Sequence, residues 1–117
     1  MGDEQQRRAA RVPLEVEVTL ESDHNFFTGV AANISEGGVF IAMNHPPPIG
    51  TEVGFELLLG GERFLVMGVV RWLRDERAAS SGAPEGCGVR WIHLEDGAID
   101  AIDRFIGTRD TDFYEED

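Results

Sequence analysis

With 117 residues, 42% of them hydrophobic, the chain is long enough for one domain with one core. Its formal net charge of −12 argues against DNA, RNA and anionic membrane surfaces as partners, because these partners are bound by neutralising many negative charges. No apolar run approaches the roughly 20 residues of a membrane span, and the polar start lacks the apolar stretch of a secretory signal, so a cytoplasmic protein without membrane insertion is expected.

Residues 1–11 are expected to form a flexible, basic N-terminal arm. Arg7, Arg8 and Arg11 lie here, within five positions. Residues 12–117 carry seven arginines and twenty acids, a net charge of −13, so the arm is a positively charged segment of an otherwise acidic protein. The planar guanidinium donates two parallel hydrogen bonds, which suits phosphates and guanine edges. A solvated basic tail is the alternative interpretation.

Period-two alternation of apolar and polar residues, which is typical of half-buried strands, recurs along the middle of the chain. In chain order, strands are expected at 14–21, 26–34, 39–43, 52–59, 64–73 and 88–92. The strand at 64–73 is almost continuously apolar, which predicts burial on both faces near its centre. Turns are expected at 22–25, 35–38 and Gly60-Gly61, and loops at 44–50 and 75–86.

After the strands, apolar residues fall at helical spacing. Ala98, Ile102 and Ile106 are among them, and they predict a short amphipathic helix that ends at Gly107. Residues 108–117 are expected to form a solvated, poorly ordered acidic tail. Several short strands with hairpin signals and one helix predict a small antiparallel β-barrel with a capping helix, since closing the sheet removes exposed strand edges.

A second polar element lies between the second and third expected strands. Asn33 and Ser35 are two positions apart, so in a strand they share a face and present an amide and a hydroxyl to one base edge. A plain Asx or Ser turn is the alternative. Gly37 and Gly38 either supply positive φ in a hairpin or let a ligand approach the backbone. Together with the arm, this element suggests a site for a small anionic ligand that contains a purine.

The remaining candidate residues indicate no catalytic or metal site. Cys87 is the single cysteine, which excludes an internal disulfide and a cysteine-based zinc site, and a small half-buried strand residue is expected. The histidines lack metal-ligand spacing and no Ser-His-Asp set is recognisable, so no enzyme is expected. Trp72 and Trp91 are core residues or, if exposed, platforms for base stacking. Arg74 and Arg90 either add positive potential or pair with surface acids.

The spacings Arg7-Arg8-x-x-Arg11 and Asn33-x-Ser35-x-x-Gly38 resemble the two signature motifs of the PilZ domain, RxxxR and (D/N)xSxxG. They occur in the family's order, one before the first strand and one between strands, and a glycine-rich strand precedes the final helix. The resemblance covers about residues 5–107. It implies an all-β fold, a six-stranded antiparallel β-barrel with a C-terminal α-helix, and a bacterial receptor for the second messenger cyclic di-GMP that is not an enzyme.

The resemblance also implies which residues bind the ligand. They are Arg7, Arg8, Arg11, Asn33, Ser35, Gly37, Gly38 and Trp72. In the family, the arginines hold phosphates and the Hoogsteen edge of guanine, the Asn and Ser positions contact a guanine, and an apolar residue at the tryptophan's place packs against a base. The domain is then expected to span 12–107, between the arm and the tail.

Family members couple cyclic di-GMP to motility, pili, exopolysaccharide or biofilm through a conformational change that is passed to a partner. An effector protein is therefore expected, whose identity the residues leave open, as they do the oligomeric state. The alternative is a PilZ-like barrel that binds a protein and no nucleotide. Retention of both motifs disfavours that alternative.

Overall fold

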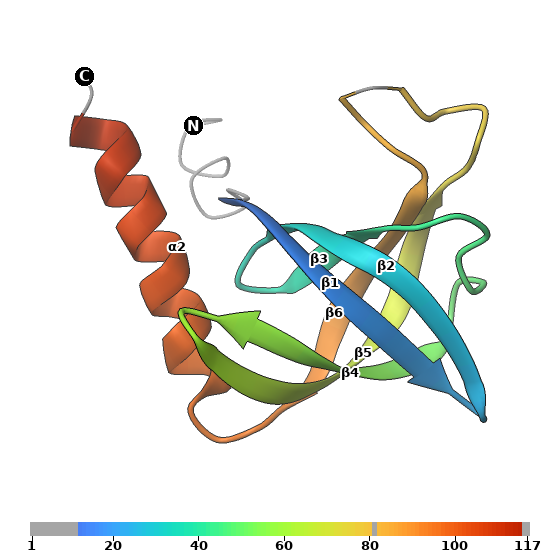
Figure 1. Ribbon diagram of the computed structural model, residues 1–117, viewed down its shortest axis with the longest axis horizontal. Helices are drawn as coiled ribbons and strands as arrows, with labels where there is room; N and C mark the ends of the chain where they lie inside the picture. Colours follow the sequence, from blue (N-terminus) through green and yellow to red (C-terminus); the bar gives the residue numbers. More distant parts are fainter. Residues whose placement is uncertain (1–11, 81, 116–117) are drawn as a thin grey trace.

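The computed structural model describes residues 12–80 and 82–115 of the chain. The N-terminal arm, with Arg7, Arg8 and Arg11, lies outside the described residues. In chain order the elements are β1 (Val12–Ser22), β2 (Asn25–Ile34), β3 (Gly38–Ala42), β4 (Glu52–Leu59), β5 (Glu62–Arg74), β6 (Gly86–Leu94) and α2 (Ala98–Glu115). Figure 1 shows α2 standing beside one end of the strands.

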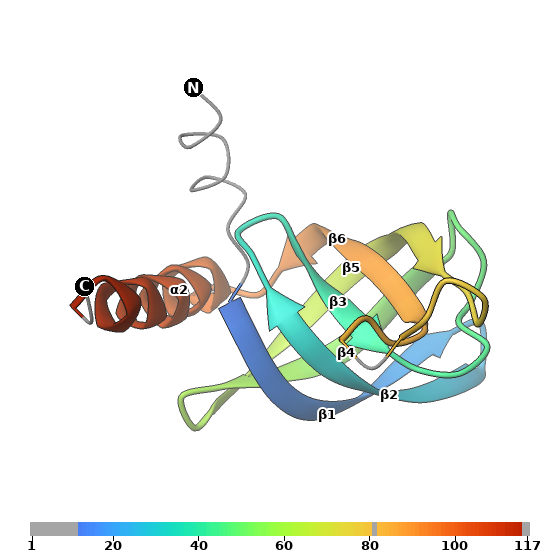
Figure 2. The same cartoon turned by 90° about the horizontal axis from the view of Figure 1, so that it is seen from above.

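The six strands close into an antiparallel barrel in the order β1-β2-β3-β6-β5-β4. Figure 2 shows the strands surrounding a common interior, with α2 extending away from it. Strands that follow each other in the chain are paired, except for β3 and β4. β3 pairs instead with β6, and β4 pairs with β1. The predicted six-stranded barrel with a C-terminal helix is therefore confirmed.

Alternate side chains of the strands point inward and build one apolar core. Its largest fully buried members include Leu20, Ile34, Ile41, Leu57 and Ile102. The helix buries Ala98, Ile102 and Ile106, three of the apolar positions that its spacing predicted, together with Ala101, whereas Ile99, also predicted, is exposed. Among the described residues no polar or charged side chain is buried, so removal of apolar surface from water is the main force that holds the barrel together.

Two hairpins turn through residues with positive φ. Gly60 (φ 56°) and Gly61 (φ 87°) connect β4 to β5, and Asp23 (φ 49°) and His24 (φ 69°) connect β1 to β2. Positive φ at both central residues is the mark of a type I′ turn, whose twist matches that of the two flanking strands. Both turns were predicted from the sequence, and the glycine pair adopts the conformation without steric strain.

The prediction that β5 is buried on both faces is wrong. Its residues alternate instead, so that Val66, Gly68 and Val70 are buried while Leu65 and Met67 are exposed. A continuous apolar run does not by itself place a strand inside two layers, since burial needs a second layer of structure over the outer face. Here the outer face of β5 carries apolar side chains on the barrel's exterior.

The prediction that Gly107 ends the helix is also wrong, because α2 continues to Glu115, through most of the expected acidic tail. Glycine in a helix interior lowers helix stability by about 1 kcal/mol without stopping the helix. The apolar contacts before Gly107 anchor α2 against β1, β4 and β5. No helix within 12–80 and 82–115 combines the length and the apolar character that crossing a membrane requires.

Cys87 is fully buried in β6, where a half-buried residue was expected, and its Sγ lies 4.0 Å from Met43 Sδ. Burial raises the pKa of the Cys87 thiol to about 11, from an ordinary value of 9.0. As the pH rises between these two values, the unfolded chain releases a proton that the folded protein keeps.

The free energy of unfolding is therefore expected to fall between pH 9.0 and about 11, by up to about 1.4 kcal/mol per pH unit. Urea unfolding at pH 8 to 11 on the wild type and on Cys87→Ala checks this. In Cys87→Ala the free energy of unfolding should fall less steeply with pH over this range, because the variant has no thiol to titrate. Equal slopes in the two proteins would show that Cys87 does not control this pH range.

Candidate ligand-binding site

Strand pairing brings the start of β1 next to the second motif. Val12 pairs with Ile34, and Pro13 pairs with Asn33. Val12 is the residue that follows the first motif, Arg7 to Arg11, in the chain. The described start of β1 therefore lies beside the second motif, whereas the first motif itself lies outside the described residues.

The turn between β2 and β3 is held by its own backbone. Asn33 is half-buried in β2, whereas Ser35 follows the end of that strand and lies in the turn. The Ser35 amide donates a hydrogen bond of 2.9 Å to the carbonyl oxygen of Gly38. The Ser35 hydroxyl lies 3.5 Å from the same oxygen, a long contact that leaves this hydroxyl weakly held by the turn.

Gly38 is required by close packing and not by positive φ. Neither Gly37 nor Gly38 is among the described residues with positive φ, so that interpretation of the glycine pair is wrong. Gly38 pairs with Arg90 of β6, and a Cβ added to Gly38 would overlap the carbonyl oxygen of Val89. A Cβ added to Gly37 meets nothing within 4 Å. The Gly37 carbonyl accepts a hydrogen bond of 3.0 Å from the Trp91 amide, which fixes the turn against β6.

A cavity of about 260 Å³ lies between this turn and strands β5 and β6. It is lined by Ser35, Gly37, Gly38, Val39, Arg71, Trp72, Gly88, Val89 and Arg90. Arg71 and Arg90 are exposed, and no described residue of the lining is acidic. On a protein with a net charge of −12, this cavity is a local positive site that suits an anionic ligand.

Trp72 forms an aromatic wall of the cavity. It is half-buried and stacks on Phe40 with ring centroids 5.2 Å apart and planes inclined by 19°. A Cβ added to Gly88 would overlap the indole, so glycine opposite the ring makes room for it. The Arg74 guanidinium lies 4.7 Å from the Phe40 centroid and donates to the Pro84 carbonyl, an arrangement that neither interpretation of Arg74 predicted. The cation over the rings stabilises the stack.

Trp91 belongs to the core. Its ring tilts against Phe55 at a centroid distance of 6.3 Å. Its indole nitrogen is buried and has no hydrogen-bond partner among the described residues. Of the two tryptophans, Trp72 is therefore the one that can meet a ligand in the cavity.

The structure brings together four of the residues proposed from the sequence, namely Ser35, Gly37, Gly38 and Trp72. Asn33 precedes this group in β2 and is not part of the cavity lining. Arg71 is a lining residue that the sequence analysis missed, and Arg90 lines the same cavity and is not in the ion pair found among the described residues. No local sequence pattern predicts that these two arginines line one cavity. They are brought to it by the pairing of β5 with β6, in which Val69 faces Arg90.

Within the described residues no group of His, Cys, Asp and Glu side chains is placed to hold a metal ion.

The sequence matches the family model of the PilZ domain over residues 5–107. Among solved structures, the chain is similar to the Bacillus subtilis inhibitor of motility MotI/DgrA, with a TM-score of 0.72 and 15% identity over 87% of this chain and 50% of that chain. It thus spans half the length of that protein. It is also similar to the PilZ domain of CeSA from a cellulose-synthesizing bacterium, with a TM-score of 0.58 and 20% identity over 84% of this chain and 95% of that chain. The comparison with curated proteins finds no match. At these identities the structural likeness shows the fold.

Proposed function

This chain belongs to the PilZ domain family, a family of cyclic di-GMP receptors, and we propose that it binds cyclic di-GMP and passes the resulting conformational change to an effector protein. The observation that carries the proposal is the positive cavity, which combines Ser35, Gly37 and Gly38 of the second motif with Arg71 and Arg90. The entry of β1 beside that motif supports a role for the arm in the same site.

Each part of the site has a chemical task in this proposal. The two cavity arginines face the phosphates, because guanidinium groups form charge-assisted hydrogen bonds with phosphate oxygens. Trp72 stacks on a guanine, a contact worth roughly 1–3 kcal/mol per base. Asn33 and Ser35 offer an amide and a hydroxyl to the base edge. The open space at Gly37 leaves the ligand a close approach to the backbone.

The proposed conformational change is closure of the arm. Arg7, Arg8 and Arg11 fold over the ligand and hold its phosphates from the side opposite the cavity. Ordering the arm costs about 1–2 kcal/mol for each residue that becomes fixed. Charge-assisted hydrogen bonds, at about 1.5–3 kcal/mol each, must offset that loss. The closed arm then presents a surface to the effector that exists only with the ligand bound.

Titration calorimetry of the wild type tests the proposal. Cyclic di-GMP should bind saturably and more weakly as salt is added, because the contacts to phosphate are ionic. Cyclic di-AMP serves as the matched control, since it has the same charge and lacks the guanine edge, and it should bind much more weakly. Absence of heat with cyclic di-GMP would favour a PilZ-like protein-interaction module. Chromatography of the recovered ligand should show it intact, whereas hydrolysis would indicate an enzyme.

A further inference from the structure

A second, larger hollow of about 1020 Å³ lies on the outer surface of the barrel, over β1, β4, β5 and the end of β6. These four strands are neighbours in the barrel order. The described pairing between β1 and β4 consists of Glu21 with Gly54, so the two strands are joined at one position and the surface between them is recessed. We name this hollow the outer groove. Its lining shares no residue with that of the positive cavity.

The middle of the outer groove is apolar. Leu58 of β4 is 40% exposed, and Leu65 and Met67 of β5 are 59% and 39% exposed. Phe26, at the start of β2, lines the same groove and is 67% exposed. Scattered apolar residues on a surface need no explanation, but apolar residues gathered on adjacent strands in a concave surface mark an interaction site.

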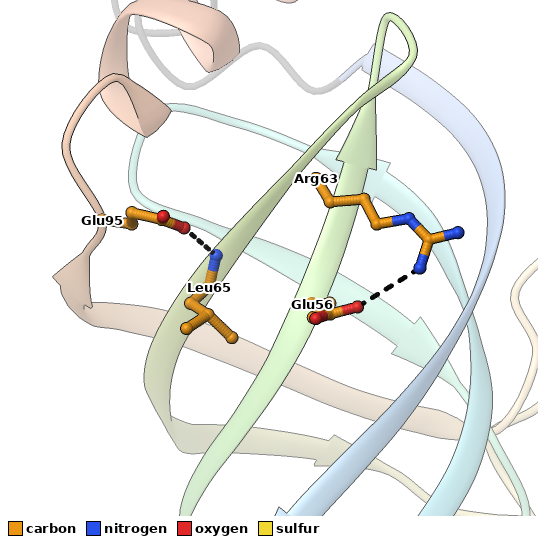
Figure 3. Close-up of polar contacts among 4 residues, drawn as sticks. All are labelled: Glu56, Arg63, Leu65 and Glu95. Atoms are coloured by element: carbon orange, nitrogen blue, oxygen red, sulfur yellow. Dashed lines mark hydrogen bonds and ion pairs between the residues drawn. The ribbon is translucent and has the colours of Figure 1, made fainter.

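Carboxylates flank this apolar strip on both sides. Glu17 and Glu21 of β1 line one side, and Glu95 and Asp96, which follow β6, line the other. Figure 3 shows the Glu95 carboxylate accepting a hydrogen bond of 2.5 Å from the Leu65 amide, which fixes it beside the strip.

One ion pair lies within the strip itself. Arg63 lines the outer groove and lies 3.5 Å from Glu56, as Figure 3 shows. Its charge is therefore balanced locally. The carboxylates on the two sides remain in excess, and the groove as a whole is negative.

We propose that the outer groove binds a basic amphipathic helix of the effector protein. The apolar face of such a helix covers the apolar strip, and lysines or arginines on its two flanks face the carboxylates of β1 and of the segment after β6. Four neighbouring strands span about 14 Å between the outer two, and a helix with its side chains is about 10–12 Å wide, so one helix fits along the groove. A second copy of this chain would bring the same carboxylates together, which opposes self-association.

This inference rests on the proposed function in one respect, that the receptor acts on an effector protein. The probe is a synthetic helical peptide with leucines on one face and lysines on both flanks, and the control peptide has glutamates in place of the lysines. Binding is measured by fluorescence anisotropy and mapped by amide chemical shifts. The lysine peptide should bind saturably and shift amides of β1, β4 and β5, whereas the glutamate peptide should not bind.

Matched variants locate the peptide. Leu65→Gln should lower its affinity about tenfold or more, since the helix would then cover a polar amide in place of a central apolar anchor. Ile99→Gln is the control, because Ile99 lies on α2 outside the groove and is also 59% exposed. That variant should bind as the wild type does. Neither residue lines the positive cavity.

Four results would overturn the inference: shifts outside the groove, binding of the glutamate peptide, unchanged affinity in Leu65→Gln, or a dimer that forms through this surface. Cyclic di-GMP is titrated into the same protein samples. Nucleotide binding without peptide binding would contradict the proposal for the outer groove and leave the proposed receptor function intact. Peptide binding without nucleotide binding would support the outer groove as a peptide site and contradict the proposed receptor function.

Discussion

Replacing Arg7 or Arg11 by alanine is expected to weaken cyclic di-GMP binding by about tenfold or more in each single variant. A charge-assisted hydrogen bond contributes about 1.5–3 kcal/mol, and every 1.4 kcal/mol or so is tenfold in affinity. The expectation rests on the first motif and on the pairing of Val12 with Ile34, which places the start of β1 beside the second motif. Calorimetry at one fixed salt concentration measures the change.

Two further variants separate the possible causes of that loss. Arg11→Lys keeps the charge and removes the planar pair of donors, so its affinity should fall between those of the wild type and the alanine variant. Arg77→Ala removes an exposed arginine in the loop between β5 and β6, outside both motifs, and should bind normally. If Arg7→Ala and Arg11→Ala both retain wild-type affinity, the arm has no part in binding.

Gly38→Ala is expected to destabilise the protein by about 3 kcal/mol, at the upper end for inserting an atom into a packed region. The added Cβ would overlap the carbonyl oxygen of Val89. This oxygen belongs to the backbone of β6, so no rotation of a side chain relieves the overlap, and β3 must move away from β6. Urea unfolding followed by circular dichroism measures the loss.

The neighbouring glycine supplies the control. Gly37→Ala places a methyl group where nothing lies within 4 Å, and its free energy of unfolding should change by about 0.5 kcal/mol or less. Equal stability of the two variants would contradict the tight contact between Gly38 and β6. Because Gly37 lines the positive cavity, weaker cyclic di-GMP binding by a fully stable Gly37→Ala would support close approach of the ligand to the backbone.

The contribution of each proposed ligand residue stays a prediction. Ser35, Gly38 and Trp72 share one cavity lining, which agrees with the family pattern that suggested them. Asn33 lies outside that lining, and the three arm arginines lie outside the described residues. The cavity supplies two further cations, Arg71 and Arg90, so the variants above test how much of the affinity the arm adds to a site that is already positive.

Local patterns in the amino-acid sequence were enough to predict the elements and the class of fold. Period-two alternation located the strands, Gly60-Gly61 located a type I′ hairpin, and the spacing of Ala98, Ile102 and Ile106 located a helix against the core. These signals are local, because side-chain alternation and turn conformation depend on residues only a few positions apart. The two motifs likewise identified the family from short spacings.

Which distant residues meet, and which side chains face outward, depends on how the strands assemble into the barrel. Insertion of β6 between β3 and β5 places Arg90 near Arg71 and sets Val89 against Gly38. No described residue forms a layer over the outer face of β5, and Leu65 there is exposed, although its apolar run predicted burial. Such outcomes depend on how the whole sheet closes, since pairing between strands far apart in the chain is fixed by the packing of the complete core and not by either strand alone.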